Sequence, residues 1–164
     1  KALPGKPLMV KLSPNVEDVV QTAKAAIDGG ADVLTLVNTF TAMSIDIHRR
    51  RPRLANVTGG LSGPAIRPIA VHMVSRVYRN VAKSAGVPIV GMGGIQTWQD
   101  AAEFILAGAT AVAIGTALFV DPATPNKVCD GLRNWIKQQG VERLSDLVGA
   151  VQLPGDQPIK TPYP

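Results

Sequence analysis

The chain alternates apolar, strand-like runs with helix-like segments. Four such runs occur, and each closes in a short polar or glycine-rich signal. The signals are KLSPN at 11–15, LVNTF at 36–40, GMGGI at 91–95 and IGTA at 114–117. This alternation predicts a parallel α/β protein, in which functional groups gather at the carboxyl ends of the strands. Because the four signals fall at those ends, we expect them on one rim of the fold.

The number of units limits the architecture. A closed TIM (β/α)8 barrel needs eight strand–helix units, whereas this chain has four. The sequence therefore predicts half of such a barrel, and the first residue, Lys1, fits a fragment or a processed chain. Edge strands of a half-barrel would expose unpaired backbone, so we expect another chain or a missing part to cover them.

Residues 1–164 are expected to form a single domain, with an extended tail over 154–164. Residues 39–63 make a long insertion after the second strand, and the segment RPRLANVTGG within it is compatible with short strands. Loops of that length are usually functional.

Apolar periodicity and capping residues locate the main elements. Strands are predicted over 8–12, 32–37, 87–90 and 110–114. The first helix is predicted from an Asn15 N-cap, with Val16 at the start of its apolar face, to Gly29 and Gly30. The other three are predicted from Pro64 to Ala85 with Ile69, Met73, Val77 and Val81 on one face, from a Thr97–Asp100 capping box to Gly108, and from Thr124 to Gly140. A short amphipathic piece is expected over 143–149.

Composition narrows the functional classes. The net charge is +5, but the charges are scattered except at His48–Arg51, so the sequence favours anionic small molecules or an acidic protein over nucleic acid. No apolar run reaches the roughly 18 residues that span a membrane. A single cysteine, Cys129, excludes an internal disulfide and points to a reducing compartment, and we expect a cytoplasmic protein.

The glycines of GMGGI and IGT predict a phosphate site. Glycine lets backbone N–H groups approach an anion closely, and the N-terminus of a following helix adds partial positive charge. Two such turns after neighbouring strands can hold one phosphate through Gly93, Gly94, Gly115 and Thr116, although tight turns alone would explain the glycines as well. A GxGxxG motif is absent, which argues against a Rossmann dinucleotide site.

Three further positions carry candidate chemistry. Lys11 lies in an apolar strand near its carboxyl end, where a buried ammonium needs a polar or charged partner. It suits a Schiff-base lysine, a cation that stabilises charge developing on a cofactor, or simply a strand-end lysine that reaches solvent. Asn38 and Thr39 end the second strand and suit an amide or imide substrate, or a turn. Ser62 and Gly63 of GGLSG are candidates to present backbone amides to a ligand.

Other reactive residue types receive no catalytic role. His72 falls within a predicted helix, where packing is the expected role, and Cys129 lies on the last helix, away from the strand ends. No metal site is predicted.

The ordered motifs together resemble a known family. The sequence is similar to the carboxyl-terminal half of dihydroorotate dehydrogenases, in their class 1B branch. The motifs that carry this resemblance are KLSPN, LVNTF, RRPRLANVTGGLSGPAIRPIA, PIVGMGGIQTWQDAAEFILAGATAVAIGTALF and DLVGAV. The resemblance covers roughly residues 6–152. It implies the second half of an FMN-containing TIM barrel that oxidises dihydroorotate to orotate in pyrimidine biosynthesis.

The resemblance also implies residue roles. Lys11 matches the lysine beside the flavin, where a cation stabilises reduced FMN. Substrate-binding positions of the family are matched by Asn38 and Thr39. Its cofactor-binding positions are matched by Val37, Ser62, Gly63, Gly93, Gly94, Gly115 and Thr116. In class 1B, electrons reach NAD+ through a partner subunit with FAD and an iron–sulfur cluster, in a homodimer or heterotetramer.

The chain departs from the family pattern in one respect. The family's catalytic base is a cysteine in the amino-terminal half, and Cys129 does not match it, so the chain alone should not turn over dihydroorotate. Alternatives are a dihydropyrimidine dehydrogenase subunit, a phosphate-sugar lyase or isomerase with a Lys11 Schiff base, and a fragment that only assembles with another half.

Overall fold

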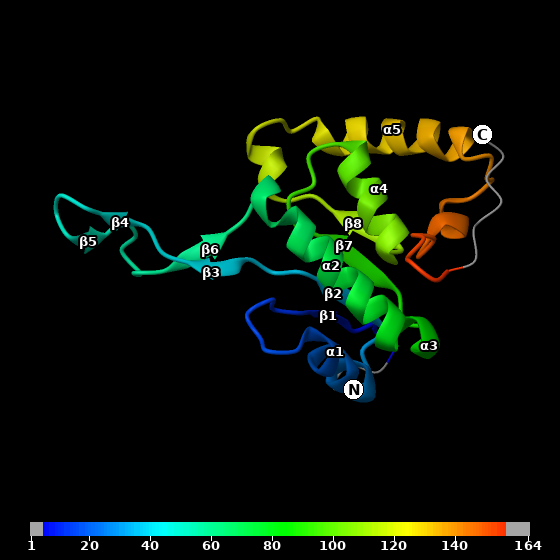
Figure 1. Cartoon of the computed structure of the whole chain (residues 1–164), viewed down its shortest axis with the longest axis horizontal. Helices are drawn as coiled ribbons and strands as arrows, with labels where there is room; N and C mark the ends of the chain where they lie inside the picture. The colour runs from blue at the N-terminus through cyan, green and yellow to red at the C-terminus, as the bar shows by residue number, and fades with distance from the viewer. Residues whose placement is uncertain (1–4, 157–164) are drawn as a thin grey trace.

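A four-stranded parallel sheet forms the centre of the computed structural model, which describes residues 5–156. Its strands are β1 (Met9–Lys11), β2 (Val33–Leu36), β7 (Ile89–Met92) and β8 (Ala111–Ala113), in the spatial order β1-β2-β7-β8 (Figure 1). Order in space follows order along the chain, and every pair is parallel. The predicted α/β class is confirmed, and the sheet is consistent with part of a TIM barrel.

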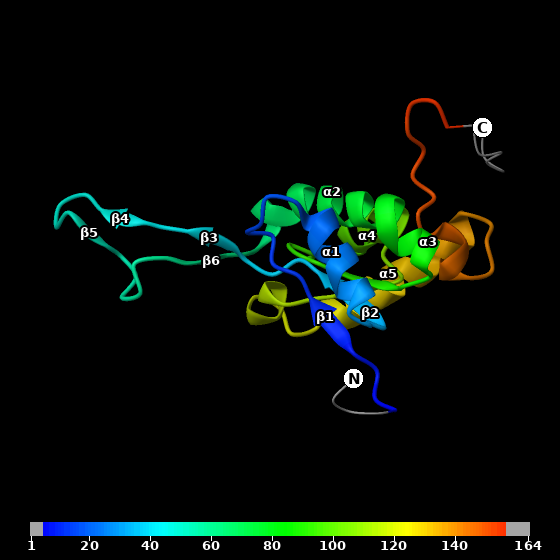
Figure 2. The same ribbon diagram turned by 90° about the horizontal axis from the view of Figure 1, so that it is seen from below.

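Helices follow these strands along the chain. They are α1 (Val19–Asp28), α2 (Arg67–Val77), α3 (Lys83–Ala85), α4 (Trp98–Ala107) and α5 (Thr124–Gln138). Shorter turns are the 3-10 segments η1 (Pro64–Ile66), η3 (Thr116–Phe119) and η4 (Leu144–Leu147), and the π-helical η2 (Tyr78–Ala82). Figures 1 and 2 show α1, α2 and α4 along one face of the sheet, and α5 packs on α4.

Strand register separates the two faces of the sheet. Val10, Leu34 and Ile89 are aligned across three strands, and Leu34 and Ile89 are fully buried under the helices. Gly91 lies on this helix-covered face, because a Cβ there would come within 2.6 Å of Phe104 Cδ1. The neighbouring row, Lys11, Thr35, Val90 and Ala111, is aligned across all four strands on the opposite face. Lys11 is therefore directed away from the apolar core.

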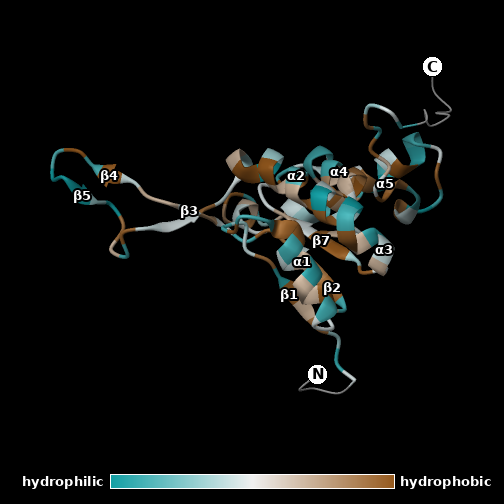
Figure 3. Ribbon diagram, turned by 60° about the horizontal axis from the view of Figure 1, so that its bottom comes forward, coloured by the Kyte–Doolittle hydropathy of each residue, from teal (hydrophilic) through white to brown (hydrophobic). Residues whose placement is uncertain are grey.

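The segment between β2 and η1 forms a long arm. β3 (Phe40–Ala42) pairs antiparallel with β6 (Gly59–Leu61), and β4 (Ile45–Asp46) with β5 (Arg51–Pro52). Figures 1 and 2 show the arm extending away from the body. Figure 3 shows hydrophobic and hydrophilic stretches along it, and Ile47 is 75% exposed. Strands β5 and β6 fall on the segment where the sequence is compatible with short strands.

Two sequence predictions about the helices are wrong. Asp18, not Asn15, is the N-cap of α1, and its Oδ1 accepts a hydrogen bond of 2.9 Å from Val20 N, so Val16 precedes the helix. Of the face predicted for the helix after Pro64, Met73, Val77 and Val81 pack on the core, but Ile69 is 47% exposed and its place on that face is wrong. A stripe built only from four-residue steps drifts by about 40° per step on a helix of 3.6 residues per turn, and in α2 Ala70 and Val74 complete the buried face in place of Ile69.

Other predicted elements are confirmed. Thr97 and Asp100 form the capping box of α4, which ends at Gly108 in the left-handed conformation with φ 119°. Helix α5 buries Val128, Leu132 and Trp135. The predicted tail lies mostly outside the described residues. In the described part of the chain, no helix is long and apolar enough to cross a membrane.

Candidate functional site

A pocket of about 370 Å³ lies at the carboxyl ends of the four parallel strands. Its walls come from the end of β1, from the ends of β7 and β8 and the loops that follow β2, β7 and β8, and from the segment before α2. All ten residues that the sequence singles out for a site line this pocket: Lys11, Val37, Asn38, Thr39, Ser62, Gly63, Gly93, Gly94, Gly115 and Thr116. The structure thus brings together segments that are up to about 100 residues apart in the chain.

Lys11 is the cation of the pocket wall. It ends β1 on the face opposite the helices, and its side chain is exposed. Within residues 5–156 its ammonium has no hydrogen-bond or ion-pair partner. The sequence left open a Lys11 that reaches solvent, and in this chain the open face of the sheet leaves its ammonium accessible. It is available to an anion in the pocket.

The loop after β2 is held by backbone and asparagine hydrogen bonds. Val37 N donates to Met92 O at 2.9 Å, and Asn38 N donates to Leu12 O at 3.0 Å, which continues the parallel pairing on both sides. Asn38 Oδ1 accepts from Thr39 N at 2.9 Å. The side-chain amide nitrogen of Asn38, Nδ2, makes no hydrogen bond within this loop, and Asn38 lies exposed on the pocket wall, where this nitrogen can donate to a ligand.

Asn15 links the first two loops of the rim. Its Nδ2 donates to Thr39 O at 3.0 Å, and its Oδ1 accepts from Thr41 N at 2.8 Å. One amide therefore fixes the backbone on either side of Phe40. The sequence predicts Asn15 as a helix cap, and its position after a strand end is the only local signal of its role in linking the loops.

The glycines of the pocket serve two different purposes. A Cβ added at Gly63 or Gly115 would meet no atom within 4 Å, so these two Cα atoms face open space. A Cβ at Gly94 would instead lie 2.6 Å from Gly63 O and 3.0 Å from Pro64 Cα. Gly93 and Gly94 both have positive φ, 136° and 77°. Their positive φ allows a tight turn in which Gly94 packs against Gly63 and Pro64 and Gly93 packs against Ile66 and Ala70, whereas Gly115 faces open space.

Two hydroxyl groups join the arm to the last strand. Thr116 Oγ1 donates to Ser62 Oγ at 2.8 Å. Thr116 starts η3 after β8, and Ser62 directly follows β6. Both side chains line the pocket, so this bond closes its rim between the arm and the IGT turn.

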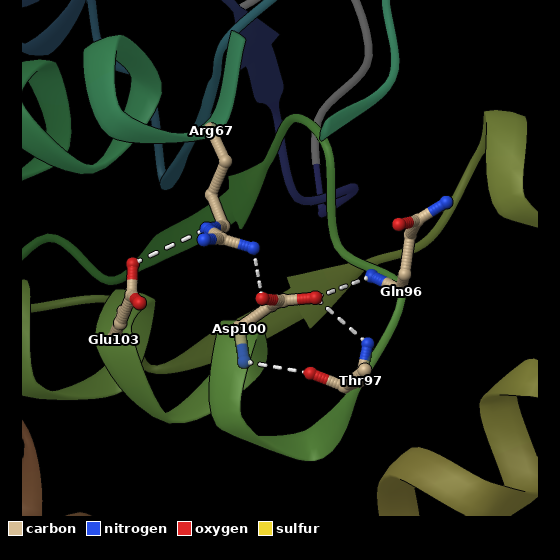
Figure 4. Close-up of polar contacts among 5 residues, drawn as sticks. All are labelled: Arg67, Gln96, Thr97, Asp100 and Glu103. Atoms are coloured by element: carbon tan, nitrogen blue, oxygen red, sulfur yellow. Dashed lines mark hydrogen bonds and ion pairs between the residues drawn. The ribbon is translucent and has the colours of Figure 1, made fainter. Parts of the chain in front are cut away.

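A buried carboxylate supports the turn that follows β7 (Figure 4). Asp100 Oδ2 accepts hydrogen bonds from Gln96 N at 2.9 Å and Thr97 N at 2.8 Å. Its Oδ1 pairs with the guanidinium of Arg67, whose Nε lies 3.4 Å from Glu103 Oε2. The sequence predicts the capping box but not its arginine partner, because Arg67 and Asp100 are 33 positions apart in the chain.

Several residues that sequence analysis did not select also line the pocket. They are mostly apolar, namely Pro64, Ile66, Met92, Ile95, Ala113, Ala117 and Val120, together with Gln96. Cys129 lies exposed on α5 and does not line the pocket. His72 is exposed on α2, so a packing role for it is wrong. No cluster of three metal-ligating side chains occurs among the residues that the structure describes.

Asp121 lies outside the pocket, just before α5, and has a lowered pKa. A hydrogen bond from the Lys127 ammonium, at 2.7 Å, and a second from Ala123 N lower the pKa of Asp121 below its ordinary value of 3.8. Asp121 therefore stabilises the start of α5 through these two bonds, and it does not line the pocket.

Comparisons with known proteins give one consistent result. The family model described as dihydroorotate dehydrogenase matches residues 1–136. The catalytic subunit of dihydroorotate dehydrogenase B (NAD(+)) from Pelobacter propionicus is 55% identical over 147 residues, which are 90% of this chain and 47% of that relative. The subunits of the same name from Trichlorobacter lovleyi and Brachyspira hyodysenteriae are 53% and 52% identical, over 93% of this chain and 49% of each relative. The chain thus spans about half the length of these curated relatives.

Proposed function

This chain belongs to the dihydroorotate dehydrogenase family, and on that premise we propose that it is the FMN-binding, carboxyl-terminal half of a class 1B catalytic subunit. The complete subunit would oxidise dihydroorotate to orotate in pyrimidine biosynthesis. The observation that carries the proposal is the single pocket in which Lys11, the loop after β2 and both glycine turns meet. A ligand with a phosphate at one end and a reactive ring at the other would use all of these groups together.

The residues of the pocket suit FMN. Gly63 and Gly115 leave open space where other residues would place a Cβ, and the apolar side chains of Ile66 and Val120 suit an aromatic ring. The phosphate would be held by Gly93, Gly94, Gly115 and Thr116. When bound, FMN would supply a two-electron acceptor for the hydride that leaves dihydroorotate.

Lys11 would act as an electrostatic group. Because its ammonium has no partner among the described residues, it is free to stabilise negative charge that develops beside it. Asn38 and Thr39, on the next loop, would bind the polar edge of the substrate, since an amide nitrogen and a hydroxyl can both donate to carbonyl or carboxylate oxygens.

The proton that leaves the substrate needs a base from outside this chain. Cys129 lies on α5, and no other cysteine is present. We therefore place the base in the amino-terminal half of the barrel and expect the chain alone to be inactive. That half would also cover β1, where Met9 is 58% exposed at the edge of the sheet, and the open side of β8.

Electrons would leave through a second protein. The relatives are named as catalytic subunits of an NAD(+)-dependent enzyme, which supports a separate electron-transfer subunit. We propose that this subunit carries FAD and an iron–sulfur cluster, in a cytoplasmic heterotetramer built on a homodimer of catalytic subunits.

The test uses the complete catalytic subunit that contains this chain. We expect it to bind FMN, identified by mass after release, and to lose its oxidised-flavin absorbance when dihydroorotate is added without oxygen. The isolated chain should bind much less FMN than the complete subunit, and dihydroorotate should not bleach its flavin at a comparable rate. Absence of flavin from the complete, folded subunit would refute the proposal.

The same preparation separates the alternatives. Bleaching by dihydrouracil but not by dihydroorotate would indicate a dihydropyrimidine dehydrogenase. A borohydride-stable adduct of a sugar phosphate on Lys11 would indicate Schiff-base chemistry, because only a covalent imine is trapped in this way.

A further inference from the structure

We propose that Arg67 and Asp100 are positioning residues that hold the Gly93–Gly94 turn of the proposed phosphate site in register with the Gly63–Ile66 segment, and that this determines how strongly the pocket prefers FMN to a flavin without phosphate. The inference rests on the proposed function. It concerns two side chains that do not line the pocket themselves. They act through the backbone of the loops that do.

Asp100 divides its two oxygens between two tasks. Oδ2 accepts the amide hydrogens of Gln96 and Thr97 and so completes the helix cap of α4. Oδ1 is not needed for that cap and pairs with the Arg67 guanidinium (Figure 4). Asp100 is only 6% exposed, so removal of Arg67 would leave a buried carboxylate oxygen without its charged partner. The ion pair with Arg67 is therefore separate from the helix cap and links α2 to α4.

The pair joins two of the segments that line the pocket. Arg67 is the first residue of α2 and follows Gly63–Ile66 directly, while Asp100 lies in the first turn of α4, after the Gly93–Gln96 loop. Gly63, Gly93 and Gly94 line the pocket on either side of this connection. A shift of Arg67 relative to Asp100 would thus move one pocket wall against the other.

The turn after β7 packs closely against the segment that leads into α2. A Cβ at Gly94 would lie 2.6 Å from Gly63 O and 3.0 Å from Arg67 Cβ, and one at Gly93 would lie 2.9 Å from Ala70 Cβ. The turn after β7 is thus in close contact with the start of α2, and the ion pair lies beside that contact. Since hydrogen bonds to a phosphate depend on sub-ångström placement of the donors, we infer that the pair tunes the phosphate end of the pocket.

The experiment compares FMN with riboflavin, which has the same ring and no phosphate. Dissociation constants of both are measured on the complete catalytic subunit, stripped of flavin, together with its thermal midpoint. The variants are R67M, which removes the charge, and R67K, which retains a charge but lacks the planar fork that reaches two carboxylates. The control is R133M on α5, where Arg133 and its partner Asp130 are 72% and 70% exposed.

We expect R67M to weaken FMN binding by about 10- to 100-fold, by analogy with outer-shell partners of metal ligands, and riboflavin binding by about 2-fold or less. R67K should show the same selective loss at a smaller factor, and it carries the test if R67M does not fold. R133M should change neither constant. An equal loss for both flavins, or no loss for either, would overturn the positioning role. If the unaltered subunit bound FMN no better than riboflavin, the phosphate site of the proposed function would itself be refuted, which is a distinguishable result.

Discussion

Two glycines of the pocket should respond in opposite ways to the same substitution. Gly94 has φ 77°, and a Cβ there would lie 2.6 Å from the carbonyl oxygen of Gly63, a backbone atom that no side-chain rotation can remove. Gly115 has φ −114°, and a Cβ there would meet nothing within 4 Å. Gly94→Ala should therefore damage the fold, and Gly115→Ala should damage only ligand binding.

The magnitudes follow from these geometries. For Gly94→Ala, about 1–2 kcal/mol comes from the left-handed conformation and about 1–3 kcal/mol from overpacking against Gly63 and Pro64. The sum, about 2–5 kcal/mol, corresponds to a fall of several degrees at about 2–4 °C per kcal/mol. Gly115→Ala should change stability by about 0.5 kcal/mol or less. Its methyl group would occupy space proposed for the phosphate, so the dissociation constant of FMN should rise.

The assay is thermal unfolding of the flavin-free complete subunit, followed by FMN titration. Gly94→Ala should lower the midpoint before any ligand is added, and Gly115→Ala should leave it in place while weakening FMN. The reverse pattern would refute the reasoning. So would an unchanged midpoint for Gly94→Ala, because the close approach to Gly63 would then have no energetic consequence.

Two further predictions concern charged groups. Lys11→Ala in the complete subunit should slow flavin reduction, measured by stopped flow, more than it weakens FMN binding. The reason is that a cation that stabilises developing charge acts mainly on the reaction step. An unchanged reduction rate would remove Lys11 from the mechanism. Asp121 has a pKa lowered chiefly by the Lys127 hydrogen bond, so its stabilising contribution is present above the ordinary value of 3.8 and is lost as the pH falls through the lower folded-state pKa. Lys127→Met should raise that pKa toward 3.8 in a carboxyl NMR titration, and an unshifted titration would contradict the assignment.

The sequence carried local signals well. Thr97 and Asp100 have the spacing of a capping box, and Gly108 has the position of a helix terminator, so the bounds of α4 could be predicted within a residue or two. Polar and glycine signals at strand ends and in the GGLSG loop selected nine residues that line one pocket, and the family resemblance added Val37, although the ligands of these residues stay predictions.

Contacts between distant segments were not predictable. Asn15 has the character of a cap residue, and only the folded loop reveals that its amide binds the backbone on either side of Phe40. Gly94 was expected to make room for a phosphate, but its Cα faces the Gly63 carbonyl. In both cases the deciding partner lies at least 24 positions away in the chain, where neither periodicity nor capping rules apply.

The central claim is that Lys11 and the two glycine turns share a single ligand. A crystal structure of the complete subunit with FMN tests it most directly. We predict the phosphate between the Gly93–Gly94 turn and the Gly115–Thr116 turn, with the flavin ring beside the Lys11 ammonium. A flavin bound elsewhere, or one that reaches the glycine turns but not Lys11, would contradict the account.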